Sequence, residues 1–224
     1  MTEQPPQRAP ITAHIERHIG PIKQVFRETA AASSIDALAV DVLPVDVLHV
    51  AATTDRPVHT LITSGMSDRP MAVPAGTDSP EYLELMMTLP REWQLDEQAP
   101  RDETWYWPIR LLLHLAGLPR QSNTWLGWGH TVPNGDPAQP FAANTQLCGA
   151  IIVPSLLVPT PFYELRLAQR TIAFYGVVPL YKEELALQQR EGMSALLEKL
   201  IDRGIRDLVD PKRRNVAVKR FGLF

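Results

Sequence analysis

The sequence predicts an α/β (α+β) fold in which a central mixed, largely antiparallel sheet is flanked by helices. Two short β-favouring runs, Val45–Val50 and Val58–Ser64, are separated by a single Thr-Thr-Asp turn, as is typical of neighbouring antiparallel strands. A later run, Arg170–Val178, alternates between residues suited to the two faces of a sheet. Leu180–Arg203 instead gathers its apolar residues on one helical stripe, which Gly192 can divide in two.

Composition limits the classes of function. The 224-residue chain is long enough for one large buried core, and 45% hydrophobic with 21% charged residues is ordinary for a globular protein. A net charge of −3 gives no reason to expect nucleic acid or an anionic membrane as a partner. No hydrophobic stretch reaches the roughly 18 residues of a membrane span. The single Cys148 cannot form an internal disulfide, which fits a reducing compartment and predicts a cytoplasmic protein.

The chain shows neither internal repeats nor a second composition regime, so we expect one domain over residues 12–224. Residues 1–11 are polar and rich in proline, and they lack the apolar segment of a signal peptide. We therefore expect them to form a disordered N-terminal tail.

The first element expected after this tail is a helix over Ile11–Thr29, because its apolar residues recur at helical spacing. Gly20-Pro21 interrupts that pattern, and a proline inside a helix removes a backbone hydrogen bond, so the helix is expected to kink or divide there. Ala37–Val42 predicts a further strand ahead of the one at Val45–Val50.

The middle of the chain predicts two helices and two strands. Ser79–Leu89 begins with a capping residue and a proline and then continues at helical spacing. Trp107–Ala116 predicts a second helix, with Gly117 as its C-terminal cap. The predicted strands, Trp125–Val132 and Gln146–Val153, lie on either side of an Asn-Gly-Asp-Pro turn.

Two histidines one helical turn apart, His14 and His18, have the spacing at which a helix offers two imidazoles to zinc. The zinc-protease motif requires glutamate directly after the first histidine, whereas here Glu16 is the second residue after it. The alternative is a solvated helix face. No further cluster supplies an obvious third ligand, so we predict no metal site and no cofactor.

The segment Gly65–Arg69 resembles the nucleophile elbow of serine hydrolases, with Ser67 in the place of the nucleophile. Arg69 stands where that motif has a second glycine, which the tight turn requires. His59 or His130 would have to act as the base. The structural alternative is that Ser67 hydrogen-bonds the backbone of its own turn.

Two other groups of residues have both a structural and a binding interpretation. Asp68 and Arg69 can brace their loop, or they can offer a carboxylate and a guanidinium to a partner. Trp125 and Trp128, in a glycine-containing segment that ends at His130, can belong to the core or form a binding hot spot.

Five separated blocks of sequence resemble the suppressor-of-fused family, in the order and spacing of its bacterial members. Together they extend over nearly everything after the first dozen residues, so the resemblance is more specific than any single motif in the chain. The blocks are His14–Phe26, His59–Met71, Glu81–Leu89, Trp107–Ala116 and Asn123–Pro137.

This resemblance implies a mixed α/β sandwich without known catalytic activity. The animal relatives are intracellular proteins that sequester a transcription factor, gripping its peptide as an added strand between this kind of domain and a second, C-terminal domain. We do not expect that second domain in a chain of this length. Bacterial members are often single domains encoded near polymorphic toxin genes, and they are proposed to be immunity proteins.

We therefore predict a non-enzymatic domain that binds another polypeptide, in its most specific form an immunity protein for a toxin encoded nearby. No catalytic residue is assigned. The alternative is a hydrolase that uses Ser67 and a histidine. The predicted partner-binding residues are Asp68, Arg69, Trp125, Trp128 and His130.

Overall fold

An eight-stranded sheet forms the centre of the part of the chain described by the computed structural model, which comprises residues 8–27, 45–95 and 102–218. The strands follow the order β1-β2-β3-β4-β8-β6-β5, and β7 also pairs with β8. Their bounds are β1 Ile22–Arg27, β2 Asp46–Val50, β3 Val58–Ser64, β4 Leu83–Pro90, β5 Thr131–Pro133, β6 Leu147–Val153, β7 Glu164–Arg166 and β8 Thr171–Tyr181.

Strand directions confirm the predicted mixed, largely antiparallel sheet. β1 to β4 pair in antiparallel fashion, as do β5 with β6 and β8 with both β6 and β7. The parallel pair is β4 with β8, in register from Leu83 opposite Ala173 to Met86 opposite Gly176. A parallel pair needs a crossover connection, and here the chain between the two strands contains α2 (Glu103–Gln121), β5, β6 and β7.

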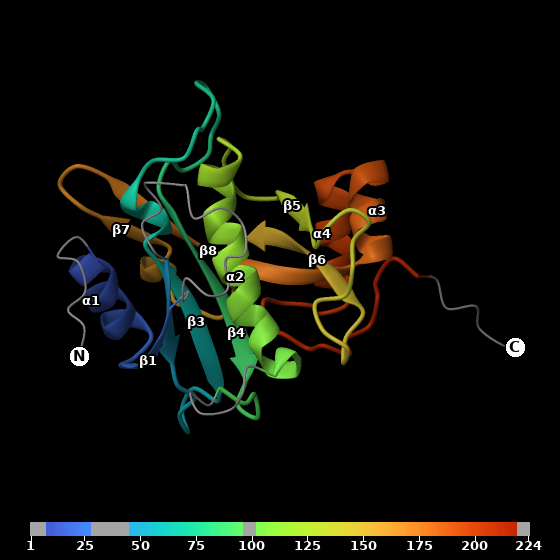
Figure 1. Ribbon diagram of the computed structural model, residues 1–224, viewed down its shortest axis with the longest axis horizontal. Coiled ribbons are helices and arrows are strands. Elements are labelled where there is room, and N and C mark those ends of the chain that lie inside the picture. The colour runs from blue at the N-terminus through green and yellow to red at the C-terminus, as the bar shows by residue number, and fades with distance from the viewer. Residues whose placement is uncertain (1–7, 28–44, 96–101, 219–224) are drawn as a thin grey trace, which may run out of the picture.

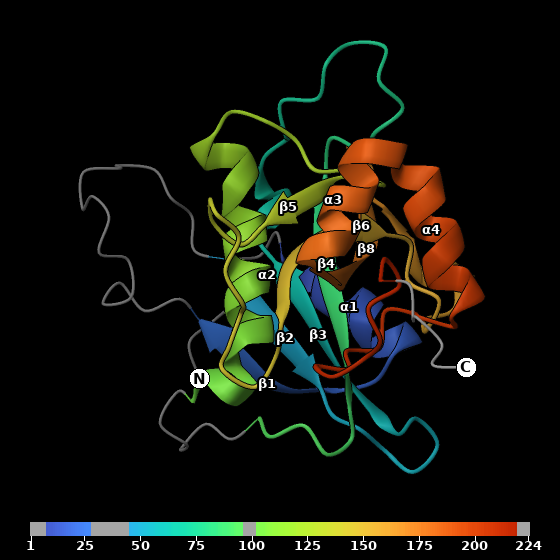
Figure 2. The ribbon, with the colours of Figure 1, turned by 90° about the vertical axis from the view of Figure 1, so that its right-hand side faces the viewer.

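Helices cover both faces of the sheet (Figure 1). α2 lies against β2, β3 and β4 on one face. α1 (Ala9–His18) packs on the other face, through Ile11 and Ile15. α3 (Lys182–Glu191) and α4 (Met193–Asp202) pack on β6 and β8, away from α1 (Figure 1). Figure 2 shows α2 and the α3–α4 pair on opposite sides of the strands.

The alternation of side chains along β8 shows how these layers are divided. Ala173 and Val177 pack in the α2 layer, Phe174 packs in the α1 layer, and Val178 packs against α3 and α4. Since successive side chains of a strand point to opposite faces, α1 and the α3–α4 pair share one face and α2 covers the other.

Residues 79–89 do not form the predicted helix. β4 begins at Leu83 and lies inside the sheet, and its residues are buried up to Leu89. A strand buried on both faces is a nearly continuous apolar run, and periodicity cannot distinguish such a run from a buried helix. The burial of both faces therefore explains why the helical interpretation was wrong.

The predicted helix over residues 11–29 is also wrong in its second half. α1 ends at His18, and after Gly20-Pro21 the chain continues as β1, which pairs with β2. Residues 8–11, which we assigned to a disordered tail, belong to the folded structure: Arg8 is 2% exposed and Ile11 is fully buried. The predicted strand at residues 37–42 lies outside the described residues.

The helix predicted over Trp107–Ala116 is confirmed but is longer at both ends. It begins after Asp102, whose side chain accepts a hydrogen bond of 2.9 Å from the backbone N–H of Thr104. It continues through Gly117 to Gln121, so that glycine is not its cap. The strand predicted at Trp125–Val132 is mostly loop, since β5 includes only Thr131–Pro133.

The C-terminal segment is fastened to the sheet by a buried ion pair. Arg213 donates to both carboxylate oxygens of Glu184, with 2.8 Å from Nη1 to Oε1, and its Nη2 also donates to the carbonyl of Pro179. Glu184 in turn accepts from the backbone N–H of Tyr181 and of Val216. These contacts hold the segment after α4 against the end of β8.

The helix predicted over residues 180–203 is confirmed from Lys182 onward as α3 and α4, which meet at Gly192 (φ 88°), whereas Leu180 and Tyr181 belong to β8. Leu196 is fully buried, so Leu196→Ala should leave a cavity and lower the free energy of unfolding by about 2–5 kcal/mol in urea denaturation. Ile201 is 68% exposed on the same helix, and Ile201→Ala should change that free energy by less than about 0.5 kcal/mol. Equal effects of the two substitutions would contradict the assigned helix face.

Candidate functional site

A tight turn follows β3. Gly65, with φ 120°, begins it in a conformation that side chains rarely adopt, and a short 3-10 helix, η2 (Met66–Asp68), follows before the chain becomes extended at Arg69. The backbone N–H groups of Gly65 and Ser67 both donate to the same carboxylate oxygen, Oε1 of Glu84 on β4, each at 3.0 Å. The turn is thus held by a residue of the neighbouring strand.

Glu84 is fully buried beneath this turn. Besides the two backbone groups, it accepts hydrogen bonds from the hydroxyl of Ser67 at 2.7 Å and from that of Thr63 at 2.5 Å. Burial raises the pKa of Glu84, and its hydrogen bonds with Thr63, Ser67 and Gly65 act in the opposite direction. The Glu84 carboxylate thus accepts four hydrogen bonds, and these bonds fix the conformation of the turn.

The predicted alternative, a hydrolase with Ser67 as nucleophile, requires a histidine hydrogen-bonded to Ser67. The contacts of Ser67, His59 and His130 do not include such a pair. Ser67 is fully buried and its hydroxyl donates to Glu84. His59 is hydrogen-bonded to His49 and to the carbonyl of Arg91. His130 packs edge-on against Trp125, with ring centroids 5.4 Å apart. The polar contacts of Ser67 therefore serve its own turn.

Asp68 is placed for bracing. Its carboxylate oxygen Oδ2 accepts from Nε of Arg8 at 3.2 Å and from Nη2 at 2.7 Å, and its side chain is fully buried. The same guanidinium reaches Asp46 at 3.3 Å. Arg8 thereby connects the start of α1 to the turn after β3 and to β2.

Arg69 lies instead at the surface, where it lines a pocket of about 420 Å³. One side of the pocket is the chain from the turn onward, and the other side is the end of α2. Arg120, in the last turn of α2, joins the two sides, because its Nη2 donates to the carbonyl of Gly65 at 2.6 Å. The lining residues are Met66, Arg69, Pro70, Met71, Ala72, Ala116, Pro119, Arg120 and Asn123.

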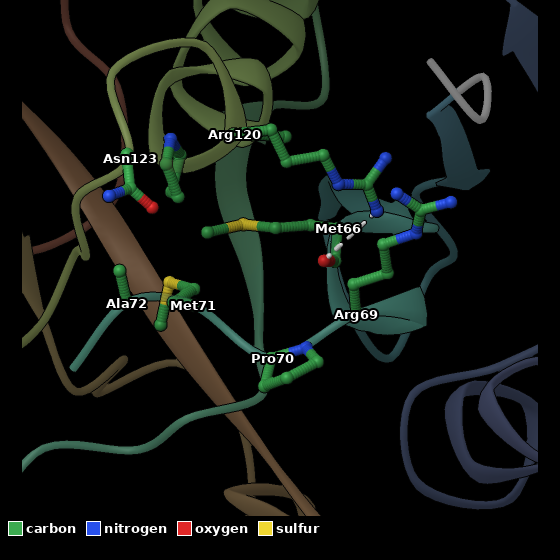
Figure 3. A pocket seen from close by; sticks show the side chains of 9 residues that line it. Met66, Arg69, Pro70, Met71, Ala72, Arg120 and Asn123 are labelled. Atoms are coloured by element: carbon green, nitrogen blue, oxygen red, sulfur yellow. Dashed lines mark hydrogen bonds between the residues drawn. The ribbon is translucent and has the colours of Figure 1, made fainter. Parts of the chain in front are cut away.

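Two guanidinium groups dominate the charge of this pocket. Figure 3 shows those of Arg69 and Arg120 beside each other at one end, with Asn123 toward the other end. Burial lowers the pKa of Arg120, nearby Asp68 opposes that change, and the charge of Arg69 adds to it. The two charged residues that line the pocket are therefore both cationic, and the Nη2 of Arg120 already donates to the carbonyl of Gly65.

The second family-like block begins at the edge of this pocket. The backbone N–H of Ala72 donates to the carbonyl of Thr124 at 3.2 Å, and that of Leu126 lies 3.5 Å from the sulfur of Met71. The structure thus brings the segments 65–72 and 123–126 together. Trp125 is half-buried, whereas Trp128 is 57% exposed.

The tryptophans earlier in the chain belong to the core. Trp107 is fully buried and stacks on Phe141 with ring centroids 5.2 Å apart. Trp105 is half-buried, and its carbonyl accepts a hydrogen bond from the indole of Trp93. Trp128 is therefore the tryptophan most available to a partner in the described chain.

His14 and His18 lie at the end of α1, with ring centroids 4.7 Å apart. His14 is buried against Phe162 and Phe174, and its Nε2 lies 3.1 Å from the carbonyl of Phe162. Burial lowers the pKa of His14. Among the residues that the structure describes, no group of three or more histidine, cysteine, aspartate or glutamate side chains is placed to hold a metal ion.

Sequence reasoning missed three residues that position the pocket: Arg8, Glu84 and Arg120. Glu84 had a signal, since it is an acidic residue inside the apolar run 83–89 and buried charges require partners. Arg8 lay in the predicted tail, and Arg120 follows a proline that we took to be beyond the helix. Their roles depend on partners far away in the chain.

The family model described as suppressor of fused protein (SUFU) matches residues 41–214, more than half of the chain. A search of curated protein sequences finds no match. In the described part of the chain, no helix combines the length and hydrophobicity needed to cross a membrane.

Solved structures show the same fold. A SUFU homolog from Neisseria gonorrhoeae FA 1090 is 15% identical with a TM-score of 0.62, and the match covers 95% of this chain and 97% of that one. The Sufu–Fu complex is 14% identical with a TM-score of 0.62, covering 96% and 93%. Drosophila Suppressor of Fused is 15% identical with a TM-score of 0.52; the match covers 77% of this chain and 42% of that larger one.

Proposed function

Because the chain belongs to the suppressor-of-fused family, we propose that it is a non-enzymatic domain that binds and sequesters a partner polypeptide. In its more specific form, the proposal is that the chain is a cytoplasmic immunity protein of a bacterial polymorphic toxin system and that its partner is a toxin encoded nearby. One of the similar structures is a complex of Sufu with Fu, and this likeness of fold is consistent with a binding role.

The observation that supports this proposal most directly is the contact between two family-like segments, in which the backbone N–H of Ala72 donates to the carbonyl of Thr124. The 65–72 segment contributes Arg69 to an open pocket, and the chain leading from residue 123 presents the exposed indole of Trp128. Arginine and tryptophan are the residue types most often found at binding hot spots. The candidate nucleophile of the alternative function, Ser67, is buried and hydrogen-bonded to Glu84.

Among the five residues predicted to bind the partner, we now propose that Arg69 and Trp128 make direct contact and that His130 supports the half-buried Trp125 from the side. Asp68 is proposed to act indirectly, because its carboxylate is engaged by Arg8. Substitution of Asp68 would therefore change stability as well as binding.

Truncation of Trp128 should weaken binding of the product of an adjacent toxin-like gene. We expect Trp128→Ala to raise the Kd by roughly thirtyfold, which corresponds to the loss of about 2 kcal/mol at a hot spot. Titration calorimetry with the purified toxin domain measures this change. Ile201→Ala is the matched control, since it also removes an exposed apolar side chain but lies on α4.

Two results would contradict parts of this proposal. Tight binding that is equally indifferent to Trp128→Ala and Ile201→Ala would place the interface elsewhere. If the toxin is not bound and co-expression does not protect cells from it, the immunity role is wrong.

A further inference from the structure

We propose that Ser79 and Met193 are positioning residues for partner binding: they pack against the turn that carries Trp128 and hold its indole in the orientation that the partner meets. This inference rests on the proposed function, in which Trp128 contacts the partner directly.

Residues 127–130 form a tight turn with Trp128 at its corner. The backbone N–H of His130 donates to the carbonyl of Gly127 at 3.1 Å, and Gly129 has φ 82°, as the third residue of a type II turn requires. Gly127 and Gly129 are buried, whereas Trp128 between them is 57% exposed. The turn therefore buries its glycines and exposes one large side chain.

Strand β6 holds the end of this turn. The backbone N–H of Gly129 donates to the carbonyl of Ile152 at 2.8 Å, and the N–H of Ile152 donates to the carbonyl of His130 at 3.0 Å. Ile152 is fully buried in β6. These hydrogen bonds attach the backbone of the turn to the sheet.

Ser79 and Met193 occupy the space that side chains at the two glycines would need. A Cβ atom added at Gly127 would overlap Oγ of Ser79, in the loop before β4. A Cβ atom added at Gly129 would overlap Sδ of Met193, the first residue of α4. Met193 also packs on the core cluster beneath α3 and α4, so the turn is supported from a loop and from a helix.

This support matters for affinity because association must order the groups that meet at an interface. A tryptophan on a freely moving loop would lose that freedom on binding, and this loss weakens the complex. A turn that is already held in place removes most of that cost. Ser79 and Met193 would thus increase affinity through Trp128, without touching the partner themselves.

Fluorine NMR of the full-length protein labelled with fluorotryptophan measures how firmly Trp128 is held. The chain has five tryptophans, and Trp128→Phe identifies the Trp128 resonance by its loss. In Met193→Ala the transverse relaxation rate of that resonance should fall by about a third, because a rigid group has an order parameter of about 0.85 and a flexible one below about 0.6. The resonance of the fully buried Trp107 is the internal reference.

Leu197→Ala is the matched control for Met193→Ala. It also truncates a half-buried apolar side chain of α4 that packs on the same core cluster. It should leave the relaxation rate of Trp128 unchanged, and thermal melting compares the stability of the two variants. An equal fall in both variants, or no fall in Met193→Ala, would overturn the role of Met193.

A double-mutant cycle separates positioning from direct contact with the partner. In titration calorimetry with the toxin domain, Met193→Ala should raise the Kd by about fivefold when Trp128 is present. In a Trp128→Ala background the same substitution should change the Kd by less than about 1.5-fold, because a positioning residue acts through the indole. An equal effect in both backgrounds would mean that Met193 does not act through Trp128, and would overturn the inference.

A size exchange tests Ser79. Gly127→Ala introduces the overlap with Oγ of Ser79 and should raise the Kd by about fivefold. Combining it with Ser79→Ala should restore the Kd, because the two Cβ atoms would then lie 3.6 Å apart, an ordinary contact distance. A Gly127→Ala variant without effect, or one that Ser79→Ala does not restore, would overturn the role of Ser79.

This inference and the proposed function can fail separately. If the toxin binds in a manner that depends on Trp128 but not on Met193, the binding function stands and the positioning role is wrong. If Met193→Ala loosens Trp128 in the free protein but the neighbouring toxin does not bind, the positioning of the indole stands and the immunity role is wrong.

Discussion

Replacement of Glu84 by alanine should lower the free energy of unfolding by about 3–5 kcal/mol, because it leaves several buried donors without an acceptor. The donors are the backbone N–H groups of Gly65 and Ser67 and the hydroxyls of Ser67 and Thr63. Urea denaturation followed by circular dichroism measures the change. Glu81→Ala is the control, since Glu81 is an exposed acidic residue just before β4 and its loss should cost less than about 0.5 kcal/mol.

The same substitution should weaken partner binding at temperatures where the protein is still folded. The turn that Glu84 holds carries Arg69, and the carbonyl of Gly65 accepts the hydrogen bond from Arg120. Loss of the anchor therefore loosens both guanidinium groups of the pocket. A Glu84→Ala variant with wild-type stability, or with wild-type affinity for the partner, would show that the turn does not depend on this carboxylate.

Acidification should remove about 3 kcal/mol of stability through His49 alone, because its pKa is lowered from 6.5 to about 4 and each unit is worth about 1.4 kcal/mol. His49 is 1% exposed, and burial is the main cause of the shift, followed by the charges of His59 and Lys23. The folded state binds fewer protons than the unfolded state, so this stability is complete above pH 6.5 and is lost as the pH falls toward 4.

Hydrogen bonds explain why His49 resists a second proton. The Nδ1 of His59 accepts from the backbone N–H of Ala52 at 3.1 Å, so its Nε2 carries the proton donated to the carbonyl of Arg91. The Nε2 of His49 must then donate to that same Nδ1 at 2.9 Å. Its own Nδ1 is buried without a hydrogen-bond partner among the described residues, and a proton added there would meet no acceptor.

Urea denaturation at pH 7 and at pH 4.5 measures this dependence. His49→Gln should be less stable at pH 7 but should lose less stability on acidification than the wild type. Some pH dependence should remain, because burial also lowers the pKa of His59 and His14. His114→Gln, on the exposed side of α2, serves as the control. An acid sensitivity that His49→Gln does not reduce would contradict this assignment.

The sequence by itself determined the elements that bury apolar residues on a single face, and those that are bounded by a strong local signal such as a short turn or a glycine. β2 and β3 were recognisable from β-favouring residues around a short turn, and α3 and α4 from a stripe that Gly192 divides. The turn after β3 was also predictable from the sequence. Gly65 follows the strand directly, Pro70 comes five residues later, and both residue types favour turns; Asp68 and Arg69 lie between them.

Only the tertiary structure decided the elements and residues whose state depends on distant partners. The apolar residues of β4 have helical spacing, and the segment is a strand because it pairs with β3 and β8 inside the sheet. Likewise, β1 is a strand because it pairs with β2. In the candidate site, Glu84 fastens the turn from the next strand, while Arg120 reaches it from the end of α2, 55 residues further along the chain. Burial and hydrogen bonding between distant segments are properties of the folded chain, and a local pattern contains only their residue types.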